Sequence, residues 1–139
     1  LPQVCCASRA YLARHGTPQR PDELAGHRAV DYQSASTGKS IPFEFTVDGR
    51  VEARSLPYTV AVNNGDAYVA ACEAGFGIVQ VPAYHVTRQL AAGTLVEVLA
   101  GFRAPPLPLT VLYPQNRHLS PRVRVFIDWL AELFADPEL

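Results

Sequence analysis

The sequence predicts an α/β fold, a three-layer sandwich with a mixed β-sheet, on three observations. Apolar runs typical of strands alternate with helical patterns from residue 3 to residue 99. Residues 59–82 are typical of a strand, a helix and a second strand, a βαβ unit whose connection should be right-handed. Residues 42–54 alternate apolar and polar side chains on both sides of Asp48-Gly49, which predicts a β-hairpin. The length of 139 residues suits one domain.

The N-terminal third is predicted to alternate short strands and helical turns. Residues 3–7 form an apolar strand, after which Ser8 caps a helix that ends at Gly16. Residues 21–26 begin with a proline and carry acidic residues behind it, as one helical turn does. A short strand at residues 29–32 and a polar loop at residues 34–40 follow.

Residues 59–82 carry the clearest local signals. Residues 59–62 and 78–81 are expected to be buried strands. Between them the helix should have one apolar face, and Gly75 or Gly77 can adopt the left-handed conformation that ends it. The residues of the apolar face are Tyr68, Val69, Cys72 and Phe76.

The start of this helix is the predicted binding site. Asn63 and Asn64 offer side-chain oxygens there, and the backbone N–H groups of a helix start favour small anions. We expect a small anion or carboxylate to bind near Ser8, Asn63, Asn64, Gly65 and Asp66. The charge of Asp66 opposes an anion, so its side chain should turn away or accept N–H bonds itself. The alternative is that the two asparagines only cap the helix.

The C-terminal third should contain two helices and two strands. A helix at residues 84–90 closes near Gly93, and strands follow at residues 95–99 and 109–113, on either side of a proline-rich crossing. In the final helix Ser120 is the N-cap and Pro121 the first residue. Its wide apolar face consists of Val123, Phe126, Ile127, Leu130, Leu133 and Phe134.

Composition excludes several classes of function. The formal net charge is −1, and the basic residues are scattered, so this chain by itself should not bind DNA. No apolar run approaches the roughly 18 residues of a membrane span, and the first residues do not form a signal peptide. Cys5, Cys6 and Cys72 are a poor disulfide framework, which favours a cytoplasmic setting. No motif indicates a catalytic centre, a metal or a cofactor.

Three segments, in order, carry a family resemblance that covers nearly the whole chain. The central one holds residues 62–66, the Ala70-Ala71 pair, residues 73–78 and Val81-Pro82. Before it come residues 7–16 and 21–24, and after it come residues 107–114 and 118–130. Together they resemble the effector-binding domain of LysR-type transcriptional regulators.

The resemblance implies a type 2 periplasmic-binding-protein-like fold, in which two α/β subdomains joined by two crossing strands hold a small-molecule inducer. Residues 1–139 would be a partial effector-binding domain. Residues 8–104 would form the second subdomain. Residues 1–7 and 105–139 would supply the crossing strands and the remaining part of the first subdomain, including the return strand and the C-terminal helix. In the family a helix-turn-helix precedes this region, so any DNA contact would come from a segment before Leu1.

The apolar final helix and the strand at residues 109–113 also predict self-association, most simply as a homodimer. Two other classes of function remain open. One is a free-standing solute-binding protein of the same fold. The other is a hydrolase that uses Cys6 or Cys72 as its nucleophile.

Overall fold

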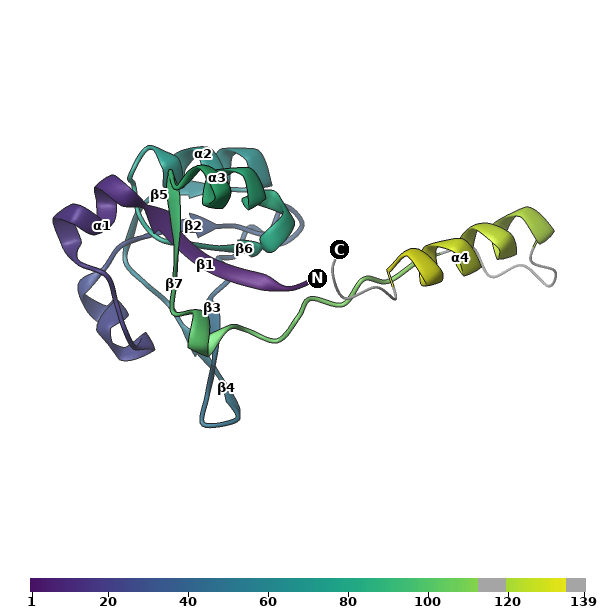
Figure 1. Cartoon of the computed structure of the whole chain (residues 1–139), viewed down its shortest axis with the longest axis horizontal. Coiled ribbons are helices and arrows are strands. Elements are labelled where there is room, and N and C mark those ends of the chain that lie inside the picture. The colour runs from purple at the N-terminus through teal and green to yellow at the C-terminus, as the bar shows by residue number, and fades with distance from the viewer. Residues whose placement is uncertain (113–119, 135–139) are drawn as a thin grey trace. The chain divides into compact units, whose positions relative to one another are not determined.

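The computed structural model describes residues 1–112 and 120–134 (Figure 1). The chain divides into two compact units, residues 2–107 and Leu1 with residues 108–139, which are described separately.

A mixed β-sheet forms the centre of the larger unit. β1 (Gln3–Ser8) lies between β6 (Val79–Pro82) and β7 (Leu95–Val98) and is antiparallel to both. β2 (Ala29–Tyr32) pairs in parallel with β5 (Tyr58–Val62). A parallel bridge between Ala29 and Ile78 joins the two groups of strands, which gives the order β5-β2-β6-β1-β7. The predicted mixed sheet is confirmed.

The alternation of side chains along β1 divides the core between the two faces of the sheet. Cys5 and Ala7 belong to one buried cluster, and Val4 and Cys6 belong to the other. On the first face lie α1 (Arg9–His15), η1 (Pro21–Gly26) and the hairpin of β3 (Phe43–Val47) and β4 (Arg50–Arg54). On the second lie α2 (Gly65–Glu73) and α3 (Thr87–Ala92), seen together in Figure 1. The fold has the three layers that the sequence predicts.

Local signals in the sequence predict most helix ends and turns. The Ser8 hydroxyl accepts a hydrogen bond from the Tyr11 N–H at 3.2 Å, and Gly16 follows α1 with a φ of 83°. Asp48 and Gly49 have φ values of 49° and 76°, as the tight hairpin turn requires. Gly75 has a φ of 84° just after α2.

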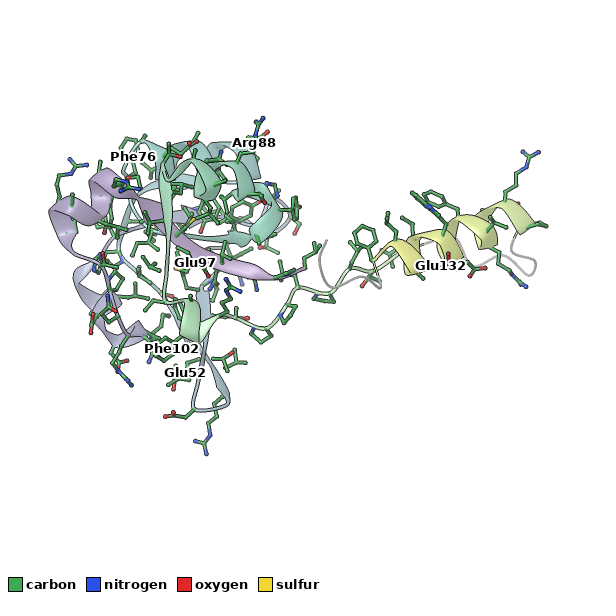
Figure 2. The ribbon with its side chains drawn as sticks, viewed as in Figure 1. Glu52, Phe76, Arg88, Glu97, Phe102 and Glu132 are labelled. Atoms are coloured by element: carbon green, nitrogen blue, oxygen red, sulfur yellow. The ribbon has the colours of Figure 1, made fainter. Side chains whose placement is uncertain are left out.

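Predictions that depend on the order of strands were partly wrong. The strand predicted to be buried, now β5, is mostly exposed, because it lies at the sheet edge and β2 is its one partner among the described strands. The predicted strand–helix–strand unit is present as β5, α2 and β6, and β2 lies between its two strands. Phe76 was expected on the buried face of α2, but it is 48% exposed and lies at the surface (Figure 2).

The helix predicted at residues 84–90 is divided into two shorter helices. A 3₁₀ turn, η2 (Ala83–His85), comes first, and α3 follows and ends at Gly93 in the left-handed conformation. After β7, the 3₁₀ turn η3 (Ala100–Phe102) completes the helices of the larger unit within the described residues.

The smaller unit contains α4 (Pro121–Leu133), which begins at a proline as predicted. The Ser120 side chain makes no capping hydrogen bond, and no side chain of α4 is buried. The predicted strand at residues 109–113 is wrong over its described part, because residues 109–112 are exposed and pair with no described strand. Tyr113 lies outside the described residues. None of the described helices is long and apolar enough to cross a membrane.

Candidate functional site

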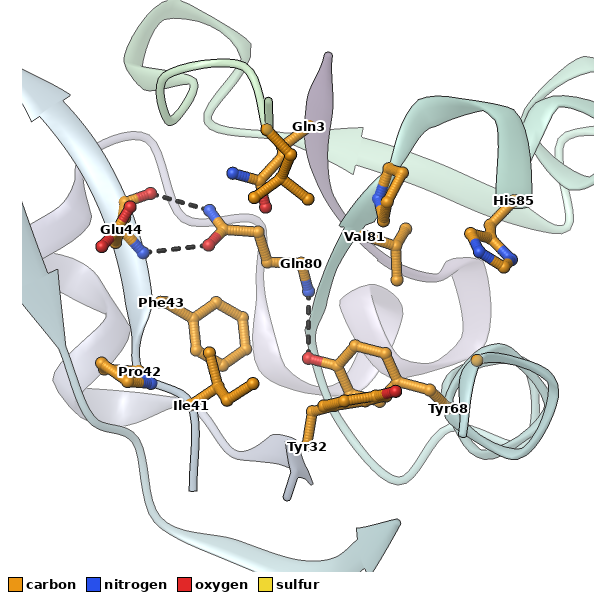
Figure 3. Close-up of a pocket in the computed structure, with 13 residues that line it drawn as sticks. Gln3, Tyr32, Ile41, Pro42, Phe43, Glu44, Tyr68, Gln80, Val81 and His85 are labelled. Atoms are coloured by element: carbon orange, nitrogen blue, oxygen red, sulfur yellow. Dashed lines mark hydrogen bonds between the residues drawn. The ribbon is translucent and has the colours of Figure 1, made fainter. Parts of the chain in front are cut away.

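A pocket of about 420 Å³ opens in the larger unit where β2 and β6 end (Figure 3). Its volume lies in the range typical of small-molecule sites. Most of its lining is apolar or aromatic, with a few polar groups among these side chains. The lining residues are Gln3, Tyr32, Ile41, Pro42, Phe43, Glu44, Gly65, Tyr68, Gln80, Val81, Pro82, His85 and Leu107.

The pocket exists because the pairing of β2 with β6 stops early. Ile78 donates its N–H to the Arg28 carbonyl at 2.9 Å, and its own carbonyl accepts from Val30 at 3.0 Å. In a continued parallel ladder the next N–H, that of Gln80, would bond to β2. It donates to the Tyr68 hydroxyl on α2 instead, at 3.2 Å. The Tyr68 side chain therefore takes the place of β2 as the hydrogen-bond partner of Gln80, and space is left beside it.

The β2 side of the pocket is built by chain that folds back on the end of the strand. The Ile41 N–H donates to the Tyr32 carbonyl at 2.9 Å, which sets residues 41–43 beside Tyr32. The rings of Tyr32 and Tyr68 meet edge to face with centroids 5.1 Å apart. These contacts make an apolar surface with two phenol groups on it.

Two polar side chains in the pocket wall, those of Gln80 and Tyr68, offer hydrogen-bonding groups. The Gln80 amide pairs with the backbone of Glu44: its oxygen accepts from the Glu44 N–H at 2.9 Å, and its nitrogen donates to the Glu44 carbonyl at 2.7 Å. Burial raises the pKa of Tyr68, so its hydroxyl stays protonated and keeps a proton to donate.

His85 lies over the first turn of α2. A Cβ on Gly65 would lie 2.9 Å from the His85 Cε1 atom, so a larger residue at this position would make the ring move. Among the lining residues, His85 is the one that carries an imidazole ring, whose N–H can donate a hydrogen bond. Within the described part of the chain, the N–H groups of Gly65 and Asp66 have no hydrogen-bond partner. An imidazole and two helix N–H donors therefore lie close together.

Of the five predicted site residues, only Gly65 lines this pocket. The Asn64 side chain caps α2 by accepting from the Ala67 N–H at 2.9 Å. The Asn63 carbonyl accepts from the Tyr32 hydroxyl at 3.5 Å. Asp66 lines a second pocket, of about 240 Å³, with Glu73 and Arg88.

Ser8 is not brought together with the asparagines. β1 is antiparallel to β6, so its last residue lies at the opposite edge of the sheet from the pocket. The Ser8 hydroxyl oxygen lies 3.5 Å from where a Cβ on Gly75 would be, beyond the C-terminal end of α2. A helix of this length spans roughly 14 Å, which separates Ser8 from the predicted group.

The cysteines do not form a nucleophilic site. All three are buried, and the Cys72 thiol donates to the Cys6 carbonyl at 3.6 Å. Burial raises the pKa of Cys5, and the contact with Cys6 followed by burial raises the pKa of Cys72. Both are therefore protonated thiols that solvent and substrate do not reach. Among the described residues, no group of three His, Cys, Asp or Glu side chains could hold a metal ion.

Sequence reasoning missed Tyr32, Gln80 and His85 as site residues and treated Tyr68 only as core. Gln80 gave one usable signal, because it is a polar residue within an apolar strand that ends at a proline. Gln80 is half-buried, and the partners of its amide come from β3.

The mixed sheet and the pocket at its edge define a periplasmic-binding-protein-like α/β domain. The family model described as LysR substrate binding domain matches residues 1–135, and the chain belongs to this family. It is 43% identical over 131 residues to the uncharacterized HTH-type transcriptional regulator YhjC of Escherichia coli K12. That alignment covers 94% of this chain and 44% of the relative.

Solved structures agree with this assignment. The CrgA regulatory domain of Neisseria meningitidis, a LysR-type transcriptional regulator, is 30% identical with a TM-score of 0.71, and the match covers 94% of this chain and 64% of that one. Full-length AphB of Vibrio cholerae is 25% identical with a TM-score of 0.77, over 95% of this chain and 44% of that one. The chain thus spans less than half the length of relatives such as YhjC.

Proposed function

We propose that this chain is the inducer-sensing part of a LysR-type regulator and binds a small, largely apolar carboxylate in the pocket beside α2. The observation that carries the proposal is the combination of an apolar, aromatic lining with His85 at the unpaired N–H groups of α2. The apolar lining fits a hydrocarbon or aromatic body. The imidazole and the helix start fit its anionic end.

Within this proposal the predicted site residues have different roles. Gly65 and Asp66 offer N–H donors to the carboxylate, and Asp66 also lines the second pocket, which His85 borders as well. Asn64 holds the helix start in place through its cap. Asn63 does not line the pocket but lies next to this turn, and we propose that its side chain, which has no hydrogen bond among the described residues, reaches the ligand.

The carboxylate can be tested with benzoate and benzyl alcohol, which share a ring and differ in charge. Benzoate should bind the full chain at least tenfold more tightly in a calorimetric or NMR titration, and His85→Gln should remove most of this preference. Asn63→Ala should weaken benzoate binding while leaving stability unchanged. Equal affinities for the two compounds would exclude an anion site. An unchanged affinity in Asn63→Ala would show that the asparagines only shape the helix start.

Control of transcription is proposed for the whole protein, in the cytoplasm, with DNA bound by a segment outside this chain. The support is the family and its relatives, which are transcriptional regulators rather than enzymes. A free-standing solute-binding protein of the same fold is not favoured by these relatives. The buried thiols likewise give no support to a hydrolase.

We also propose that the chain self-associates as a homodimer through α4. Val125, Phe126 and Trp129 are each more than half exposed on this helix, an unusual density of large apolar side chains on one element. Sedimentation velocity over a range of micromolar concentrations should show a dimer, and Phe126→Glu with Trp129→Glu should shift it to the monomer. A concentration-independent monomer in the unmodified chain would contradict this proposal.

A further inference from the structure

The β3–β4 hairpin forms one wall of the pocket, yet it is not part of the five-stranded sheet. Among the described residues, β3 pairs only with β4, in a separate two-stranded sheet. Phe43 and Phe45 anchor it in the core, with exposed fractions of 5% and 1%. This packing fixes the hairpin as a whole, but not the hydrogen-bonding edge of β3 that faces the pocket.

The side chain of Gln80 makes the hydrogen bonds to the β3 backbone that a neighbouring strand would otherwise make. Its amide makes both a donor and an acceptor bond with the Glu44 backbone, at 2.7 and 2.9 Å (Figure 3). In the described part of the chain these are the hydrogen bonds that join β3 to β6. The backbone N–H of Gln80 is at the same time held by Tyr68 at 3.2 Å. Gln80 thus connects the hairpin wall, β6 and α2 across the gap in the sheet.

The geometry points to Gln80 as a positioning residue that sets the width of the effector pocket and so determines the ring size that it accepts. The inference rests on the proposed function, because the pocket must hold a ring-bearing carboxylate. With the two bonds intact, Glu44 is held beside β6 and the pocket suits a single ring. Without them the wall is free to move outward while Phe43 and Phe45 keep the hairpin attached.

The test compares Gln80→Met, which keeps the length of the side chain and loses both bonds, with the unmodified full chain. Benzoate and 2-naphthoate are the probes, followed by two-dimensional ¹H–¹⁵N NMR. We expect Gln80→Met to weaken benzoate binding about tenfold and 2-naphthoate binding much less, so that the ratio of the two affinities changes at least fivefold. The side chain in Gln80→Glu can still accept a hydrogen bond from the Glu44 N–H. Its ratio of benzoate to 2-naphthoate affinity should therefore lie between those of the unmodified chain and Gln80→Met. Gln89→Met on α3 is the matched control and should leave both affinities unchanged.

Hydrogen exchange in the absence of any probe supplies a second measurement. The Glu44 amide should lose protection in Gln80→Met, whereas amides that face β4 within the hairpin, such as that of Phe45, should keep theirs. An unchanged affinity ratio, or an equal loss for both acids, would overturn the inference. If the unmodified chain binds neither acid, the proposed ligand class is wrong, and unchanged protection of Glu44 would then overturn the positioning role as well.

Discussion

His27 is a nearly buried histidine whose ring is held by a tyrosine rather than by an acid. Its Nδ1 lies 3.2 Å from the Tyr11 hydroxyl, and the Tyr11 ring stacks on His15 at 4.2 Å. Burial, and secondly the nearby His15, lowers the pKa of His27 from its usual 6.5, against a smaller opposing effect of Glu23.

The lowered pKa of His27 predicts a loss of stability in acid. The folded state binds fewer protons than the unfolded state, so the stabilisation is complete above pH 6.5 and is lost as the pH falls from there through the folded-state pKa. Urea unfolding at pH 7.5 and 5.5 should show this drop, and His27→Gln should reduce it. Equal pH dependence in the two proteins would contradict the assignment to His27.

Gly77 lies too close to the backbone of a neighbouring segment to leave room for a side chain. A Cβ at this position would lie 2.5 Å from the Arg28 carbonyl oxygen and 2.7 Å from the Ala29 carbonyl carbon, both backbone atoms. Gly77→Ala should therefore destabilise the chain by about 2–3 kcal/mol in urea unfolding, since β2 must shift. Gly26→Ala is the matched control, because nothing lies within 4 Å of its added methyl group, and it should change stability by less than about 0.5 kcal/mol.

At the scale of elements, α2 depends on one of two adjacent asparagines. Asn64 caps the helix through the Ala67 N–H, whereas the side chain of Asn63 has no such bond among the described residues. Asn64→Ala should cost about 1 kcal/mol in urea unfolding. Asn63→Ala should cost less than about 0.5 kcal/mol. Equal losses would mean that both side chains support the helix start.

The elements also show where sequence reasoning succeeds and where it ends. The cap at Ser8, the turn at Asp48-Gly49 and the helix end at Gly75 depend on residues only a few positions apart, and all three were predicted. The exposure of β5 and the gap that makes the pocket depend on which strands are neighbours. The place of Ser8 likewise depends on the direction of β1, which is antiparallel to β6. No local pattern encodes this direction, so the sequence alone grouped Ser8 with the asparagines.

At the scale of the whole molecule, the buried core lies entirely in residues 4–104 among the residues that the structure describes. Both core clusters, one on each face of the sheet, are complete within the larger unit. The hydrophobic stabilisation of this unit should therefore not require residues beyond Leu107.

A chain that ends at Leu107 is accordingly expected to fold, with a thermal midpoint within about 5 °C of the full chain, because it loses no described core residue. A chain that ends at Gly93 is the control. It removes β7, which pairs with β1 and buries Leu95 and Val98, and it should not unfold cooperatively. Circular dichroism melts of the three chains make the comparison. If the chain ending at Leu107 is unfolded while the full chain is folded, residues 108–139 supply stabilisation that the core of the larger unit lacks.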